Sequence, residues 1–329
     1  MKPRTPWKDN LAYAAMRLAT TVISIFPLET GRRFMRTLGT FWFYAPSKLA
    51  TAWWVIPPVR KFLTRLGAHR ARAEAHIRRS FPGMDERRVS QIALASMQHW
   101  AMLFGVEMFQ TPRLIRPGTW ARHVRLGAGL GDAIRILLSK RGCIMCTAHY
   151  GSFELLGYTL ARLGFDITAV MRPLDNPRLN ALLLDAREAG GLKLLYKKGA
   201  TRSAEDVLKE GGALCFIADQ NAGSKGVFVD FFGRAASTYK SIGLLAMEHN
   251  VPIIVGCARR VSERFDYEME LNRIIEPDEW RRQDDPLRWV TQEFSTAMEE
   301  FIRKAPEQYL WMHRRWKSRP KGEAPGASE

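Results

Sequence analysis

The 329-residue chain has few cysteines and few acidic residues, and both shortages narrow its possible functions. Four cysteines, Cys143, Cys146, Cys215 and Cys257, do not provide the disulfide framework of a small secreted protein, which fits a reducing compartment. Asp and Glu number 33 against 50 Lys and Arg, so the formal net charge is +17. A balance this basic predicts negatively charged partners, namely nucleic acid, anionic lipid headgroups or an acidic protein.

The chain also lacks an apolar run of the ~20 residues that a membrane-spanning helix needs. The run Leu11–Leu28 is interrupted by Arg17 and closed by Pro27. An aromatic run over 41–56 is broken by Pro46 and Lys48 and is followed by Pro57 and Pro58. We interpret residues 1–58 as interfacial or half-inserted helices of a membrane-associated region. A single N-terminal anchor and a buried helix of a soluble protein are the alternatives.

A basic cluster directly follows these segments, at residues 59–79. Apolar and then basic is the order of a membrane-surface element, in which each cation near anionic headgroups contributes about 1 kcal/mol. A solvated helix face is the alternative. The cluster has one acidic residue, Glu74, against seven basic ones: Arg60, Lys61, Arg65, Arg70, Arg72, Arg78 and Arg79.

Helix and strand patterns alternate beyond a long amphipathic helix that is predicted to begin at Asp85 and to end at Pro112. The alternation predicts an α/β fold, in which a mostly parallel sheet is covered by helices. We expect an α/β domain over 59–317 and a disordered tail over 318–329. Strands are predicted at 143–147, 167–171, 193–196, 213–218, 227–231 and 252–257, with an edge strand at 267–271. Helices are predicted at 132–139, 152–163, 176–189 (capped by Asp175), 203–209, 239–249 and 287–303.

His149 and Glu154 lie five positions apart, between the strand at 143–147 and the helix at 152–163. The histidine is thus expected at the carboxyl end of a strand, where ligands approach an open α/β sheet. A turn between the two residues lets the carboxylate reach the imidazole, because positions five apart on one helix point away from each other. A carboxylate on one ring nitrogen sets the tautomer and raises the basicity of the other. We therefore predict that His149 is a general base oriented by Glu154, with a substrate hydroxyl as the nucleophile.

Other chemistries have weaker support. Cys143 and Cys146, with His149 three residues on, are spaced like a zinc corner, but they lie in an apolar run, and positions three apart on a strand face opposite sides. We interpret both as core thiols and expect no metal and no cofactor. Ser152 lacks the G-x-S-x-G context of a serine nucleophile. The basic and aromatic segment 313–317 has no nucleic-acid-binding motif beside it, so no nucleic-acid partner is expected. The remaining histidines are interpreted as structural: His69, His76, His99, His123 and His249.

Five segments, in order over about 140–320, resemble those of a known family. They are His149-x4-Glu154, Met171-Arg-Pro-Leu-Asp-Asn-Pro177, Ala218-Asp-Gln220, Phe231-Phe-Gly-Arg-Ala-Ala-Ser-Thr238 and Pro306-Glu-Gln-Tyr-Leu-Trp-Met-His-Arg-Arg-Trp-Lys317. They make the chain similar to the lipid A late acyltransferases, a lauroyl and myristoyl transferase group within the lysophospholipid acyltransferase superfamily.

This resemblance implies transfer of a fatty acyl group from acyl carrier protein to a hydroxyl of a lipid A precursor, at the cytoplasmic face of the bacterial inner membrane. It implies His149 as general base and Glu154 as its partner, and substrate-binding or supporting roles for Arg172, Arg187, Asp219 and Gln220. A structural ion pair between Arg187 and Asp219 is the alternative. The segment Asn221–Lys225 departs from the family pattern and leaves the acceptor open. Other possibilities are a different glycolipid or aminolipid with acyl-CoA as donor, and a catalytically silent lipid-binding membrane protein.

Overall fold

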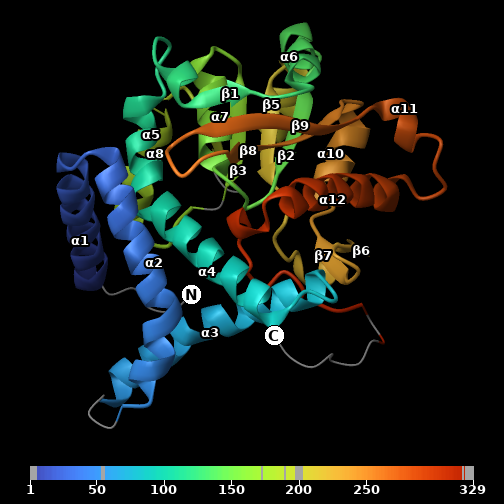
Figure 1. The fold of residues 1–329 in the computed structure, drawn as a ribbon. Helices are drawn as coiled ribbons and strands as arrows, with labels where there is room; N and C mark the ends of the chain where they lie inside the picture. Colours follow the sequence, from blue (N-terminus) through green and yellow to red (C-terminus); the bar gives the residue numbers. More distant parts are fainter. Residues whose placement is uncertain are drawn as a thin grey trace.

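A computed structural model of the chain describes residues 6–52, 56–171, 173–188, 190–196, 203–320 and 322. Its N-terminal third is helical and lies beside an α/β part, as Figure 1 shows. The helical part contains α1 (Pro6–Ile25), α2 (Leu28–Ala50), α3 (Pro57–Ser80) and α4 (Glu86–Met102). The helix α2 packs along α3 and α4. Since α3 begins at Pro57, the predicted domain boundary at residue 58 falls in the first turn of a helix.

The α/β part is built on a seven-stranded sheet with the order β1-β9-β8-β2-β5-β3-β4. All neighbouring strands are parallel except β8 and β9, which confirms the predicted mostly parallel sheet. Its strands are β1 (Val124–Leu126), β2 (Cys143–Thr147), β3 (Ile167–Met171), β4 (Lys193–Tyr196), β5 (Ala213–Ile217), β8 (Ile253–Arg260) and β9 (Tyr267–Ile275).

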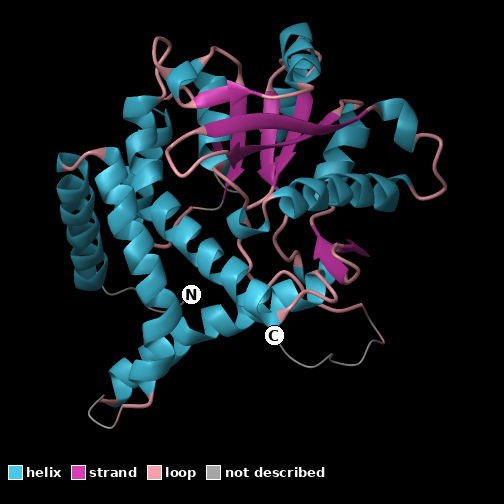
Figure 2. Cartoon of the chain, in the orientation of Figure 1, coloured by secondary structure: helices cyan, strands magenta, loops and turns pink. Residues whose placement is uncertain are grey.

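Helices cover both faces of this sheet (Figure 2), which is why its inner strands β2, β3 and β5 are almost wholly apolar. Neighbouring residues of one strand divide between two cores: Ile253 packs with the α10 and α12 side, and Ile254 with the α6 and α7 side. The covering helices are α6 (Leu130–Ser139), α7 (Phe153–Arg162), α8 (Pro177–Glu188), α9 (Ala204–Lys209), α10 (Ser241–His249) and α12 (Pro286–Lys304), with the short α11 (Pro277–Trp280) before the last.

A separate antiparallel hairpin, β6 (Val227–Asp230) and β7 (Ala235–Thr238), packs against α12. Its turn passes through Phe232 and Gly233, which have φ angles of 55° and 69°. After α12 the chain forms a short 3-10 turn, η4 (Pro306–Gln308), and then runs back past α4. The segment 306–317 is therefore next to both the helical part and the sheet.

Three local predictions were wrong. The strand at Tyr267 is not an edge strand: it extends to Ile275 inside the sheet, and the edge is β1, whose three residues are too few to show a periodic pattern. The helix that starts after Asp85 does not end at Pro112. It continues through a π-helical turn, η1 (Leu103–Glu107), into α5 (Met108–Leu114). A proline removes only its own N–H, so the residues after it still donate to the helix.

The third wrong prediction concerns the cap of α8. The side chain of Asn176, not Asp175, accepts from the backbone N–H groups of Arg178 and Leu179, at 3.0 and 3.2 Å. Both residues favour helix caps, so the sequence did not distinguish them.

None of the helices, as far as the chain is described, combines the length and the apolar character needed to cross a bilayer. The membrane association of residues 1–58 therefore stays a prediction. The predicted tail over 318–329 lies mostly outside the described residues.

Candidate active site

The histidine of the candidate site is held by an aspartate from the neighbouring strand. His149 Nδ1 lies 2.7 Å from Asp219 Oδ1, and the His149 backbone N–H donates to Asp219 Oδ2 at 3.0 Å. The strands β2 and β5 are parallel and in register, with Thr147 opposite Ile217. His149 and Asp219 each follow their paired residue by two positions, so they emerge side by side at the carboxyl edge of the sheet.

This geometry sets the tautomer of the imidazole. Because Asp219 Oδ1 is an acceptor, Nδ1 carries the proton and Nε2 has the lone pair. The side-chain amide of Gln220 lies 3.4 Å from Nε2, on the side where the lone pair points. The side chain of His149 keeps 12% of its surface exposed, whereas Asp219 is buried. Asp219 thus holds the imidazole at Nδ1, and Nε2 is the nitrogen available to act as a base.

Electrostatics keep Asp219 ionised. Burial alone would raise the pKa of Asp219, but the charge of His149, the hydrogen bonds from it and the nearby His313 lower the pKa below its usual value. The ring of His313 is nearly parallel to that of His149, with centroids 6.4 Å apart. Phe153 and Trp100 complete the surroundings, with ring centroids 5.5 and 6.2 Å from that of His149.

The turn after His149 depends on Gly151. This residue has a φ of 54°, and a Cβ there would collide with the backbone carbonyl oxygen of Ala258. The next residue, Ser152, is buried, and its hydroxyl accepts from the backbone N–H of Leu155 at the start of α7. Ser152 is therefore a helix cap rather than an exposed nucleophile.

Glu154 does not orient His149, and that prediction is wrong. Both of its carboxylate oxygens accept from Arg187: Oε1 from Nε, and Oε2 from a terminal nitrogen at 2.6 Å. The turn at Gly151 directs α7 away from the histidine, so that Glu154 on its first turn faces α8. The alternative of an Arg187–Asp219 ion pair is wrong too, since each residue has a different partner. Arg172 lies outside the described residues.

A second histidine supports the turn, which fits its predicted structural role, although no local pattern indicated which backbone it would bind. His99 is fully buried on α4, and its Nε2 lies 3.0 Å from the carbonyl oxygen of Gly151. Burial lowers the pKa of His99 well below its usual value, and the charge of Arg260 lowers it further. His76 and His123 likewise bond backbone carbonyl groups, those of Trp311 and Phe265, which fits their predicted structural role.

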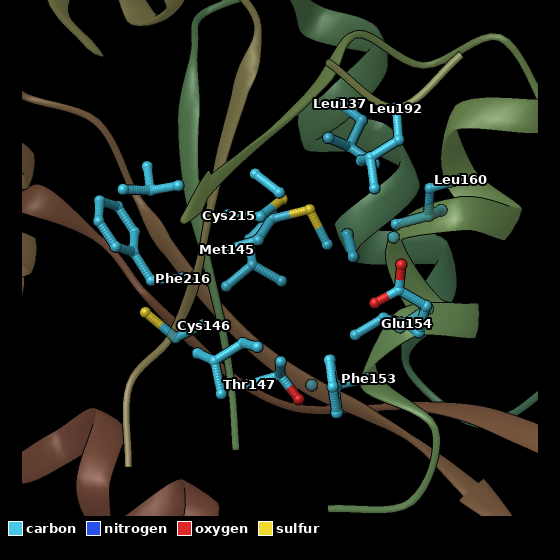
Figure 3. A pocket seen from close by; sticks show the side chains of 18 of the residues that line it. Leu137, Met145, Cys146, Thr147, Phe153, Glu154, Leu160, Leu192, Cys215 and Phe216 are labelled. Carbon is cyan, nitrogen blue, oxygen red and sulfur yellow. The ribbon is translucent and has the colours of Figure 1, made fainter. Parts of the chain in front are cut away.

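An apolar cavity of about 100 Å³ lies between the sheet and the helices α6 and α7 (Figure 3). It extends from Thr147 and Phe153, close to His149 in the chain, towards Leu137 and Leu192. The Glu154–Arg187 pair lies in its wall. Other lining side chains are Met145, Cys146, Leu160, Cys215 and Phe216.

The thiols behave as predicted core residues. Cys143 and Cys146 are buried and unpaired, and burial raises the pKa of Cys143 to about 12. The described part of the chain contains no group of three or more His, Cys, Asp or Glu side chains arranged to hold a metal ion.

The fold and the site together define an α/β protein that places a histidine–carboxylate pair at the carboxyl edge of a parallel sheet, beside an apolar cavity. Residues 58–318 match the family model of the bacterial lipid A biosynthesis acyltransferases. The chain belongs to this family.

Three relatives illustrate the range of the family. The chain is 29% identical over 199 residues to the lipid A biosynthesis palmitoleoyltransferase of Escherichia coli (60% of this chain, 62% of the relative). It is 26% identical over 247 residues to the lipid A biosynthesis lauroyltransferase of E. coli (74% and 77%). It is 30% identical over 136 residues to a phosphatidylinositol mannoside acyltransferase of Mycolicibacterium smegmatis (38% and 44%). The chain thus spans less than two thirds of the length of the palmitoleoyltransferase.

Proposed function

We propose that this protein transfers a fatty acyl group from a thioester to a hydroxyl of a lipid A precursor or a similar glycolipid. The observation that carries the proposal is the His149–Asp219 pair beside an apolar cavity. The pair supplies a base for a hydroxyl, and the cavity supplies a place for a hydrocarbon chain. Membership of an acyltransferase family supports the same reaction.

In the proposed reaction, the acceptor hydroxyl gives its proton to His149 Nε2 while its oxygen attacks the thioester carbonyl carbon. The Asp219 carboxylate stabilises the imidazolium that forms. When the tetrahedral intermediate collapses, the C–S bond breaks and the thiol leaves with the proton from Nε2. No covalent acyl-enzyme is needed. A base held in this way contributes about 10²–10⁴-fold to the rate.

The acyl chain is proposed to lie in the cavity, with its carbonyl group near Phe153. The developing oxyanion then lies near the backbone N–H groups that begin α7, where the helix dipole favours negative charge. Arg187 is a poorer donor to that oxyanion, because Nε and one terminal nitrogen bind Glu154 and the other terminal nitrogen contacts the sulfur of Met171. We assign the Glu154–Arg187 pair to the cavity wall instead.

The partners follow from charge and from the relatives. A net charge of +17 favours an acidic acyl carrier protein as donor and a phosphorylated glycolipid as acceptor. The match to a phosphatidylinositol mannoside acyltransferase supports a second candidate, a mannosylated phosphoinositide acceptor. Acyl-CoA is the alternative donor.

We also propose that the protein works at an anionic membrane surface, on the cytoplasmic face of the inner membrane. An apolar stripe on α1 and α2 supports this, because its members repeat at helical spacing and are all exposed. The apolar stripe consists of Trp7, Leu11, Leu18, Val22, Ile25, Phe34, Leu38 and Phe41.

The test is turnover by the purified protein, with acyl carrier protein carrying C12–C16 chains and either a lipid A precursor or a mannosylated phosphoinositide. We expect acylated lipid A precursor by mass spectrometry, and loss of turnover in His149→Ala. Ser152→Ala is the matched control, because it removes only a helix cap and keeps the base.

Two outcomes contradict the proposal. Turnover that survives in His149→Ala excludes the histidine as base. Lipid binding without turnover on either acceptor favours a catalytically silent lipid-binding protein. If the phosphoinositide is acylated in preference to the lipid A precursor, the second candidate is the acceptor.

A further inference from the structure

The C-terminal segment 306–317 lies against both loops of the candidate site. The Leu310 backbone N–H donates to the His149 carbonyl oxygen at 3.0 Å, and the Gly151 N–H donates to the Gln308 carbonyl oxygen at 3.2 Å. Tyr309 forms an isolated β-bridge with Tyr150. These bonds attach the segment to the backbone of the histidine turn.

The same segment reaches the aspartate loop through Arg315. This side chain is 1% exposed. One terminal nitrogen donates to the carbonyl oxygens of Gln220 and Ser237, at 3.3 and 2.5 Å. The other donates to the Thr238 hydroxyl at 2.6 Å. Gln220 directly follows Asp219, so Arg315 holds the loop that carries the acid.

The oxygens that Arg315 binds are neutral, and a neutral donor would satisfy them. Burying a guanidinium for that purpose alone is costly. Burial lowers the pKa of Arg315, and interactions with Tyr309 and with the buried Asp219 partly oppose this. The planar guanidinium, however, reaches three oxygens at once and so joins the Asp219–Gln220 loop to β7.

We propose that Arg315 is a positioning residue, which holds the Asp219–Gln220 loop against the histidine turn. It touches neither the substrate nor the reacting atoms. It acts by setting the His149–Asp219 distance, through a segment that also fixes the His149 backbone. The effect on the rate rests on the proposed function, whereas the effect on the pair does not.

The experiment compares Arg315→Met, Arg315→Lys and Thr238→Val in the full-length protein. Thr238→Val removes one oxygen that Arg315 binds and keeps the shape of the side chain. We expect kcat to fall ~10²-fold in Arg315→Met, because a small misplacement of a catalytic group has an effect of this size. Smaller falls in kcat are expected in Arg315→Lys and Thr238→Val. In each of the three variants KM is expected to change by a smaller factor than kcat. The exposed neighbour gives the matched control, Arg314→Met, for which wild-type kcat is expected.

A second readout needs no substrate. The His149 Nδ1 proton, shared with Asp219, is expected as a low-field signal in the NMR spectrum of the histidine-labelled wild type, and as a weakened or lost signal in Arg315→Met. A folded Arg315→Met with wild-type kcat and signal overturns the proposal. If that variant does not fold, Thr238→Val decides, and wild-type kcat and signal in it overturn the proposal. If the wild type acylates neither acceptor, the signal still tests the positioning, so the two proposals fail separately.

Discussion

At the scale of single residues, the site depends on which carboxylate reaches the imidazole. Asp219 makes two hydrogen bonds to His149, one to the ring and one to the backbone. Glu154 is bound to Arg187 and lies in the cavity wall. Replacement of each acid by its amide is therefore expected to have different consequences for turnover.

Asp219→Asn is expected to lower kcat by about 10²–10⁴-fold, because an amide neither stabilises the imidazolium nor fixes the tautomer. Glu154→Gln leaves Arg187 without its counter-ion and is expected to act mainly on stability and on the apparent affinity for the acyl donor. Steady-state kinetics with both variants measure this. A larger kcat effect in Glu154→Gln than in Asp219→Asn would restore Glu154 as the partner of the histidine.

The buried His99 is expected to make the free energy of unfolding depend on pH. Its folded-state pKa is lowered, so between that pKa and about 6.5 the unfolded chain binds a proton that the folded chain does not. Stability from this group is therefore present above pH 6.5 and is lost as the pH falls, by up to about 1.4 kcal/mol per pH unit. His99→Gln keeps an amide donor for the Gly151 carbonyl and does not titrate. Urea unfolding between pH 5 and 7 is expected to show a flatter dependence in the variant, and equal slopes would contradict the assignment.

At the scale of elements, the inner strands β2, β3 and β5 were predicted well, whereas the edge strand β1 and the connections between helices were not. The strands β2, β3 and β4 have the predicted bounds, because short apolar runs between turn residues are a local property. The π-helical turn η1 was missed, since it depends on what packs against it. It lies against α2, and its last residue, Glu107, is buried there.

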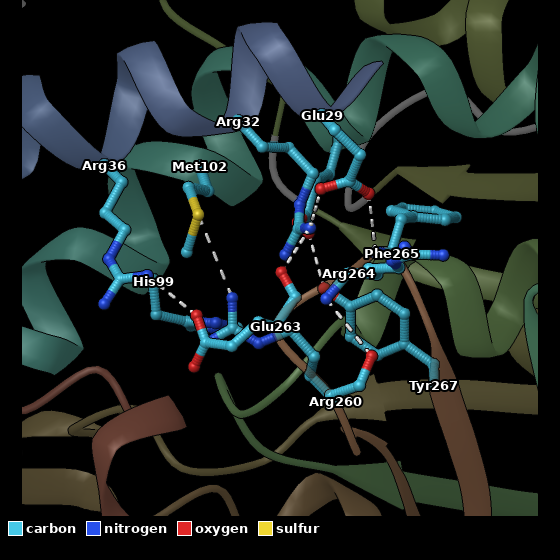
Figure 4. Close-up of polar contacts among 12 residues, drawn as sticks. Glu29, Arg32, Arg36, His99, Met102, Arg260, Glu263, Arg264, Phe265 and Tyr267 are labelled. Carbon is cyan, nitrogen blue, oxygen red and sulfur yellow. Dashed lines mark hydrogen bonds and ion pairs between the residues drawn. The ribbon is translucent and has the colours of Figure 1, made fainter.

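Glu107 belongs to a buried polar cluster that joins the N-terminal helices to the sheet. Figure 4 shows Glu29, Arg32, Glu263 and Tyr267, which surround it. Arg32 on α2 donates to Glu107, to Glu29 and to the carbonyl oxygen of Glu263, each at 2.7 Å. The hydroxyl of Tyr267 on β9 donates to the other oxygen of Glu107. These contacts attach the N-terminal end of α2 to β9 and to the loop before it.

Removing one charge of this cluster is expected to be more harmful than removing two. Arg32→Met leaves Glu107 buried without its cation and is expected to lower the free energy of unfolding by about 3–5 kcal/mol. The double variant Arg32→Met/Glu107→Gln is expected to lose less than Arg32→Met. Arg36→Met is the control, because its ion pair with Glu263 is exposed and contributes about 0–1 kcal/mol. Urea unfolding measures all three, and equal losses in Arg32→Met and Arg36→Met would contradict a buried ion pair.

At the scale of the whole molecule, the helical part carries exposed apolar side chains on two helices and a basic cluster on the next. The apolar stripe lies on α1 and α2, and the basic cluster of 59–79 lies on α3, the next helix. Such a pairing fits a helix pair that lies in the interface of an anionic bilayer rather than across it.

Phe34→Asp/Phe41→Asp is expected to weaken binding to vesicles that contain anionic lipid, because each buried Phe side chain contributes roughly 1.5–3 kcal/mol. Leu138→Asp, on α6 of the α/β part, replaces an exposed apolar side chain outside the apolar stripe and serves as control. Sedimentation with vesicles measures the bound fraction. Wild-type binding by the double variant would assign the membrane contact to the basic cluster instead.

The sequence by itself determined the class of fold, the family and the position of the candidate histidine at a strand end. All three depend on local periodicity and on short ordered motifs. The sequence also indicates where strands end, and it contains the Ala218-Asp219-Gln220 segment at one of these ends. Only the tertiary structure decided that Asp219, 70 positions away, and not the nearby Glu154, holds His149. The reason is physical: which side chains meet depends on which strands pair, and β2 lies beside β5 through sheet packing that no local pattern encodes.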